Sequence, residues 1–163
     1  MTSTAYEIAR TVTDPEMPML TLEDLGVLRG VSQIGTTTLV TITPTYSGCP
    51  AMATMRDDLV HALQDHGFED VRIDVALSPA WSSDWITPRG RRALVEHGIS
   101  APGPAHRPSG PVQLNLWPTR RAVACPRCGS ETAELTSEFG STACKALYKC
   151  GTCLEPFDHV KEI

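Results

Sequence analysis

Residues 37–77 read TTLVTITPTYSGCPAMATMRDDLVHALQDHGFEDVRIDVAL, and this stretch decides the fold of the N-terminal half. Thr37–Thr43 is rich in β-branched residues and predicts a strand. Val71–Leu77 alternates strictly between apolar and other side chains, which predicts a second strand with one buried face. Between them, Pro50–His66 has its apolar side chains on one helical face. The sequence therefore predicts a helix that connects two strands.

The flanking residues extend this pattern in both directions. Leu25–Ile34 predicts a strand that turns at Gly35 and forms a hairpin with the next strand. Ala5–Val12 predicts a short helix, which must stop before Pro15, and Thr87–His97 predicts a last helix with a threonine cap and a proline in its first turn. The order α-β-β-α-β-α predicts a small α+β sandwich with helices packed on one face of a sheet.

Composition and charge restrict the class of protein. The chain has 163 residues, 41% of them hydrophobic and 20% charged, which suits one globular domain with or without a small module. A net charge of −5 without a stripe of Lys and Arg argues against a protein whose main task is to bind nucleic acid. No secretory leader and no apolar run near the ~20 residues of a membrane helix are present, so we expect a cytoplasmic protein.

A Pro- and Gly-rich stretch divides the chain. Residues 101–111, APGPAHRPSGP, contain four Pro and two Gly, which neither a helix nor a central strand tolerates. We expect an α+β domain over 1–100, a linker over 101–121 and a separate module over 122–163. A module of this size cannot build a sufficient hydrophobic core, so it needs a metal or disulfides.

Two CxxC pairs supply the ligands for such a metal. Cys125-Pro-Arg-Cys128 and Cys150-Gly-Thr-Cys153 predict a four-cysteine zinc ribbon with one structural zinc per chain, because each tight turn offers two thiolates to a tetrahedral ion. A rubredoxin-like iron site with the same ligands remains an alternative. Two disulfides are disfavoured in a chain without a secretory leader.

Two further residues lie close to this cluster in the sequence. A tetrahedral site has no room for Cys144, so it is either a small buried residue of the ribbon or a thiol for redox or cluster chemistry. His159 is either a competing ligand or an ordinary histidine outside the site. The near-neutral charge of the C-terminal third, net +1 over residues 101–163, favours a protein partner over nucleic acid.

A lone cysteine stands apart from the ribbon. Cys49 precedes Pro50, which suits a first helical position, so we expect Cys49 at the helix N-cap. Free amides and the helix dipole would there lower the thiol pKa and favour a thiolate that receives or donates a soft metal. The alternative is a small capping residue without chemistry. His61 and His66 lie further along the same helix, so a cysteine protease or acyltransferase is unsupported.

Two loops complete the set of candidate segments. Asp14-Pro15-Glu16 combines two carboxylates with a rigid proline, and by itself it is explained as the turn that stops the first helix. Trp81 and Trp85 fall in the loop between the third strand and the last helix. They are either plugs of the core or part of a surface that binds a partner.

Taken together, these motifs resemble a known family. Asp14-Pro15-Glu16, Tyr46-Ser-Gly-Cys-Pro50 and Trp81…Trp85 are similar to the iron–sulfur assembly domain of SufT-type and MIP-type proteins, over about residues 4–100. With the ribbon sequence FGSTACKALYKC, residues 139–150, and Glu155-Pro-Phe, the whole chain resembles the PaaD family of accessory proteins of the bacterial phenylacetyl-CoA epoxidase system.

The resemblance implies a non-catalytic maturation factor in phenylacetate degradation, which assists assembly or delivery of iron–sulfur or di-iron centres. It implies that the oxygenase and reductase subunits of the epoxidase are partners, together with the iron–sulfur assembly machinery. By position, Cys49 matches the family's reactive cysteine, which would handle iron or a cluster transiently, and Asp14 and Glu16 match its acidic motif. One cysteine cannot hold a cluster, so a second copy in a homodimer or a client must supply further ligands. The alternative is a permanent structural or electron-transfer subunit of the epoxidase.

Overall fold

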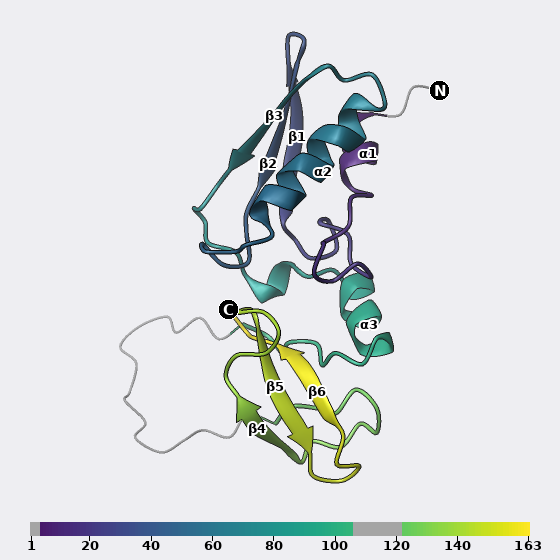
Figure 1. Ribbon diagram of the computed structural model, residues 1–163, viewed down its shortest axis with the longest axis vertical. Coiled ribbons are helices and arrows are strands. Elements are labelled where there is room, and N and C mark those ends of the chain that lie inside the picture. Colours follow the sequence, from purple (N-terminus) through teal and green to yellow (C-terminus); the bar gives the residue numbers. More distant parts are fainter. Residues whose placement is uncertain (1–3, 106–121) are drawn as a thin grey trace. The chain divides into compact units, whose positions relative to one another are not determined.

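The computed structural model describes residues 4–105 and 122–163 and divides into two compact units, Met1–Ala93 and Leu94–Ile163. Figure 1 shows the elements of both units. The described helices and strands are α1 (Ala5–Ala9), β1 (Leu28–Ile34), β2 (Thr37–Ile42), α2 (Met52–Gln64), β3 (Asp70–Val75), the 3-10 helix η1 (Ser83–Trp85), α3 (Pro88–Glu96), β4 (Ala133–Ser137), β5 (Lys145–Cys150) and β6 (Pro156–Val160). None of these helices is long and apolar enough to cross a membrane.

The first unit is the predicted α+β arrangement. Its sheet has the order β1-β2-β3, with β1 and β2 antiparallel and β2 and β3 parallel. The hairpin turns at Gly35, which has a positive φ of 63°, and the parallel pair is connected through α2. α2 packs against β3 and α1, and α1 also packs against β1 (Figure 1). The expected fold class is therefore confirmed.

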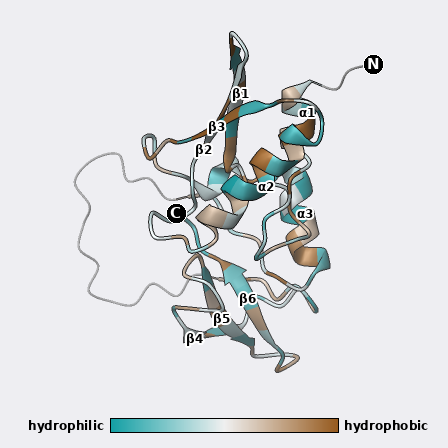
Figure 2. Cartoon of the chain, turned by 45° about the horizontal axis from the view of Figure 1, so that its top comes forward, coloured by the Kyte–Doolittle hydropathy of each residue, from teal (hydrophilic) through white to brown (hydrophobic). Residues whose placement is uncertain are grey.

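Burial follows the predicted periodicities. Along the central strand β2, Thr38, Val40 and Ile42 are buried, whereas the residues between them are only partly covered. On α2, the buried side chains are Met55, Leu59 and Leu63. Figure 2 shows hydrophobic and hydrophilic residues side by side along this helix. The helix and the strand therefore bury their apolar faces, and this burial is the main source of stability of the unit.

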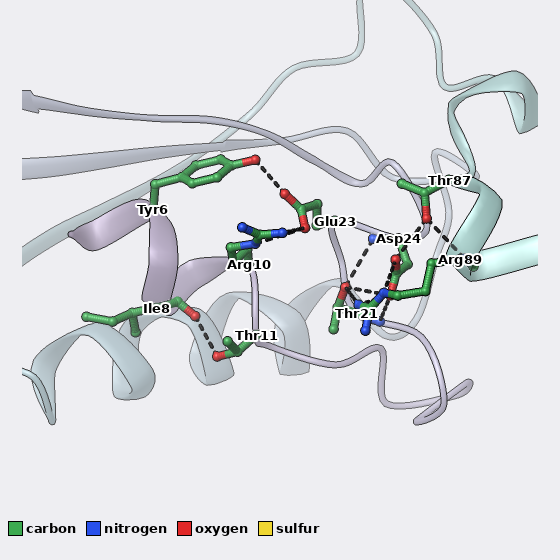
Figure 3. Close-up of polar contacts among 10 residues, drawn as sticks. Tyr6, Ile8, Arg10, Thr11, Thr21, Glu23, Asp24, Thr87 and Arg89 are labelled. Atoms are coloured by element: carbon green, nitrogen blue, oxygen red, sulfur yellow. Dashed lines mark hydrogen bonds and ion pairs between the residues drawn. The ribbon is translucent and has the colours of Figure 1, made fainter. Parts of the chain in front are cut away.

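The loop before β1 is anchored to two helices. On its first side, Tyr6 of α1 and Arg10 at the C-cap of α1 both bind the carboxylate of Glu23, and the Arg10 Nη2 atom lies 2.9 Å from Glu23 Oε2 (Figure 3). On its second side, the buried Asp24 accepts hydrogen bonds from Thr87 Oγ1, at 2.8 Å, and from the guanidinium of Arg89 at the start of α3.

Asp24 is ionised in this setting. Burial acts to raise the pKa of its carboxyl, but the hydrogen bonds from Arg89, Thr87 and Thr21 outweigh burial and lower the pKa. Space around this residue is also tight, since a Cβ atom at Gly90 would lie 2.8 Å from the Asp24 carbonyl oxygen. The Asp24 carboxylate thus holds the loop before β1 in close contact with the first turn of α3.

The second unit contains an antiparallel sheet of the order β4-β5-β6. Its small core consists of Val123, Cys125, Cys150 and Phe157, with Ala133 and Tyr148 packed against it. Tyr148 stacks on Phe157, with ring centroids 6.1 Å apart. Leu94, Ile99, Ala146 and Val160 are also buried in this unit. Even with them the apolar core is small for a unit of this size, which favours further support from a metal.

Residues that precede the ribbon in the sequence also pair with it. Ser100 forms a parallel bridge with His159: its N–H donates to Asp158 O at 2.8 Å, and its carbonyl accepts from the Val160 N–H at 3.1 Å. The Gly103 N–H donates to Glu162 Oε1 at 3.0 Å. The boundaries 1–100, 101–121 and 122–163 stay a prediction, and residues 106–121 of the predicted linker lie outside the described residues.

We expect Asp24→Asn to lower the free energy of unfolding by about 2 kcal/mol, because the amide removes the ion pair but keeps the size of the side chain. Ionised Asp24 stabilises the folded chain above the ordinary aspartate pKa near ~3.9, and that stabilisation is lost as the pH falls through the lowered pKa. The difference in the free energy of unfolding between wild type and variant, measured with urea, should therefore be largest at pH 7 and become smaller below about pH 4. Asp57→Asn on the exposed face of α2 is the matched control. An equal loss at pH 3 and pH 7 would contradict the assignment.

Candidate functional site

The clearest site is the cluster formed by the two CxxC turns. The sulfurs of Cys125, Cys128, Cys150 and Cys153 all lie within 4.8 Å of one another. The Cys125 and Cys153 sulfurs are 3.7 Å apart, and those of Cys128 and Cys150 are 3.6 Å apart. Among the described residues, this group brings together the four cysteines that the sequence analysis selected as ligands.

Backbone geometry closes each turn around its sulfurs. In the first turn, the Gly129 N–H donates to Cys125 O at 2.9 Å, and Gly129 has a positive φ of 73°. In the second, the Leu154 N–H donates to Cys150 O at 3.1 Å, and Leu154 adopts a φ of 64°. A non-glycine residue rarely occupies this left-handed region, which indicates that the surrounding structure enforces the turn.

The amides of the second turn favour a thiolate. The N–H groups of Cys153 and Thr152 lie 3.4 Å from the Cys150 sulfur and lower the pKa of that thiol to about 6. A backbone hydrogen bond from Glu155 acts to lower the pKa of Cys153, but desolvation and the neighbouring sulfurs outweigh it and raise the pKa to about 12. Thiols this close cannot all ionise unless a cation compensates their charge.

These distances fit a tetrahedral metal centre. With metal–sulfur bonds of about 2.3 Å, the sulfurs of a tetrahedral zinc thiolate site lie about 3.8 Å apart. Two of the six separations, 3.7 and 3.6 Å, agree with this value, and all six are within 4.8 Å. The residues present therefore fit a four-thiolate metal, and the four cysteines form a metal-binding cluster in a zinc-ribbon fold.

The other two candidate residues of the ribbon lie outside the cluster. Cys144 is buried directly before β5, with its sulfur 3.1 Å from Thr142 Oγ1. His159 is buried on β6, with Nε2 3.3 Å from Glu162 Oε1. Cys144 is thus a small buried residue, as one of the two alternatives for it stated.

Cys49 lies in a turn ahead of α2 and is partly exposed. Its N–H donates to Tyr46 O at 3.1 Å, and its carbonyl accepts from the Met52 N–H at 3.3 Å. The N-cap of α2 is Ala51, so the prediction of an N-cap at Cys49 is wrong. Because the turn takes up Pro50 and Ala51, the helix begins two residues later than the proline suggested.

The acidic loop has a structural use for one of its carboxylates. Asp14 is buried, and its Oδ1 atom accepts the N–H groups of Glu16 at 2.9 Å and Met17 at 2.8 Å. Glu16 is exposed. Asp14 therefore shapes the turn that follows the first helical region, and the functional roles of Asp14 and Glu16 stay a prediction.

The two tryptophans pack against the loop before β1. Trp81 is buried and its indole N–H donates to Leu25 O at 2.9 Å. Trp85 is half-buried under the Arg29 guanidinium, which lies 3.7 Å from the ring centroid. A Cβ atom at Gly26 would lie only 2.5 Å from Trp85 Cβ, so this position requires glycine. Trp81 is therefore a core plug.

Comparisons with known proteins match both ends of the chain to families. Residues 5–75 match the family model of the iron–sulfur cluster assembly protein, and residues 110–161 match that of the PaaD zinc β-ribbon domain. The chain is 47% identical to a protein of Escherichia coli (strain K12) that is named as a subunit of a 1,2-phenylacetyl-CoA epoxidase. This likeness extends over 92% of this chain and 86% of the relative.

Two partial relatives match the first unit. An Fe–S protein maturation auxiliary factor of Porphyromonas gingivalis (strain ATCC BAA-308 / W83) is 33% identical over 55% of this chain and 84% of its own length. A crystal structure of a domain of unknown function, DUF59, from Bacillus anthracis superimposes with a TM-score of 0.51 and 24% identity, over 55% of this chain and 87% of that chain. The structural match supports the fold of the first unit.

We expect about one tightly bound metal ion per chain at this cluster. Cys150→Ser should abolish stoichiometric binding and unfold the ribbon, because a serine hydroxyl does not ionise to complete the thiolate set. Elemental analysis measures the metal, and hydrogen exchange of β4–β6 measures the fold. Cys144→Ser is the matched control, since it removes a buried thiol outside the cluster. Retention of one metal ion by Cys150→Ser would contradict the ligand assignment.

Proposed function

Because the chain belongs to the PaaD family, we propose that it is a non-catalytic accessory factor of a phenylacetyl-CoA epoxidase, which assists assembly or delivery of the enzyme's iron–sulfur or di-iron centres. The observation that carries the proposal is the combination of an iron–sulfur assembly domain and a PaaD-type ribbon in a single chain. A relative named as a maturation auxiliary factor supports the same role for the first unit.

Within the first unit, Cys49 is the residue that would handle the transferred iron or cluster. It is the one cysteine among residues 4–105, and its partial exposure allows contact with a client. Gly48 precedes Cys49 in the turn before α2, and a Cβ atom at Gly48 would come within 2.8 Å of the Tyr46 ring. A single thiolate binds iron weakly, which suits transient transfer and requires further ligands from a client or a second copy.

Asp14 and Glu16 are the second part of this proposal. Oxygen ligands are suited to iron outside a cluster, so the acidic loop would assist the thiolate while iron is exchanged. Asp14 additionally fixes the loop through the two N–H groups it accepts. Glu16 is exposed and is the carboxylate that would meet a partner.

The ribbon has a separate role in the proposal. Its metal would be zinc with a structural role, since zinc has no redox chemistry and is commonly held by closed four-thiolate sites in ribbon folds. An iron site with the same ligands is distinguished by its visible spectrum. The ribbon would recognise the oxygenase or reductase subunit, while Cys49 acts on the centre that is being assembled.

A second candidate function is a permanent place in the epoxidase complex. The name of the Escherichia coli relative, which counts that protein among the subunits of the enzyme, favours this alternative. Stable co-purification with the oxygenase at a fixed ratio would support it. A factor that acts transiently is needed only during assembly, so it should be dispensable once the partners hold their metals.

We expect Cys49→Ser to leave the fold and the ribbon metal unchanged but to lower epoxidation of phenylacetyl-CoA by oxygenase and reductase co-produced with it. Serine retains the size of the residue and removes the soft ligand. Activity should fall about tenfold or more, in proportion to the iron content of the purified partners. Metal analysis of each partner, with and without this protein, is the measurement.

Cys144→Ser is again the matched control, since its thiol is buried in the second unit. Partners that carry normal iron and full activity after co-production with Cys49→Ser would overturn the role of this residue. Normal partners in the complete absence of the chain would overturn the maturation function as a whole.

A further inference from the structure

Three hydroxyls beside the metal cluster form a closed ring. Ser130 Oγ lies 2.8 Å from Thr132 Oγ1 and 2.7 Å from Thr152 Oγ1, and the two threonine oxygens are 3.1 Å apart. Each hydroxyl can donate one hydrogen bond and accept others, so the ring satisfies all three groups at once. No sulfur belongs to the ring, and its members come from segments up to 22 residues apart in the sequence.

Each member of the ring belongs to a segment that shapes the cluster. Ser130 closes the first turn, because its carbonyl accepts the Cys125 N–H at 2.9 Å. Thr152 stands inside the second turn, and its own N–H points to the Cys150 sulfur at 3.4 Å. The ring therefore connects the two chain segments that carry the ligand pairs.

Thr132 connects the ring to the backbone of the second turn. Its carbonyl accepts the Gly151 N–H at 2.6 Å, and a Cβ atom at Gly151 would lie 2.6 Å from the same oxygen. The two backbone segments thus approach as closely as glycine permits. This contact and the hydroxyl ring act together to set the distance between the turns.

We propose that Ser130, Thr132 and Thr152 are positioning residues for the metal centre, which hold the two CxxC turns at the sulfur spacing that one ion requires. The inference rests on the proposed metal centre. A ligand set that is already in place loses less conformational freedom when the ion binds. The ion should also dissociate more slowly, because the ring resists the separation of the two turns that breaking the metal–sulfur bonds requires. The ring would thus lengthen the time for which the ribbon retains its metal.

The test is the rate at which a chromogenic chelator removes zinc from the full-length, zinc-loaded chain. Thr152→Val keeps the branched shape and removes the hydroxyl, and we expect metal release to become about fivefold faster. Thr152→Ser restores a hydroxyl and should return the rate to that of the wild type. Loading with cobalt reports through its thiolate absorption whether the four sulfurs still surround the ion.

Thr136→Val is the matched control, because it is the same substitution at an exposed residue of β4 that does not belong to the ring. The double variant of Ser130→Ala and Thr152→Val should accelerate release by less than the product of the single effects, because both remove the same hydrogen bond. Equal rates for Thr152→Val and Thr136→Val, or single effects that multiply, would overturn the proposal. The proposal would also be overturned if Thr152→Val lost the cobalt–thiolate absorption and Thr152→Ser did not restore it. The isolated chain suffices, so failure of the maturation role would leave this test unaffected.

Discussion

The charge of four clustered thiols is the constraint on which the second unit depends. Sulfurs within 4.8 Å of one another repel when ionised, and the core around Phe157 is too small to impose such crowding by hydrophobic burial alone. A bound cation would attract all four thiolates, and it would thereby hold the first turn against the second turn, which follows β5. The same sulfur arrangement is supported by the backbone around it. Leu154 adopts a left-handed conformation in the second turn, and amides of that turn point to the Cys150 sulfur.

The first unit rests on a different electrostatic arrangement. There a buried carboxylate, Asp24, is satisfied by Arg89 and two threonines and holds the loop before β1 against α3. In the same loop, Leu25 accepts the hydrogen bond of the Trp81 indole, and Gly26 lies in close contact with Trp85. Polar contacts thus fix the irregular loop that leads into β1. The turn of Cys49 follows β2 at this same end of the sheet, since the first residue of β1 pairs with the last residue of β2.

Periodic features could be predicted from the sequence, and contacts between distant polar groups could not. The alternation that starts at Val71 and the spacing of leucines in α2 indicated a strand and a helix, and the CxxC spacing indicated the metal cluster. The strand is shorter than predicted, since it ends at Val75 and leaves Leu77 exposed. The cap at Cys49 was wrong because proline permits a first helical turn without requiring one. The hydroxyl ring had no sequence signal, since Ser130 and Thr152 meet only after the turns have folded.

The contrast between the two cysteine sites bears on what each can do. In the ribbon, the four sulfurs would fill all four positions of a tetrahedral ion, which is the property of a structural site. Cys49 offers one sulfur in a partly exposed turn, and the acidic motif uses Asp14 to hold its own backbone. Such an incomplete ligand set would, on the proposed function, bind iron only when a second molecule contributes ligands. On the proposed function, this incompleteness is what allows the metal to move on to the client, because a chain that satisfied the iron by itself would retain it.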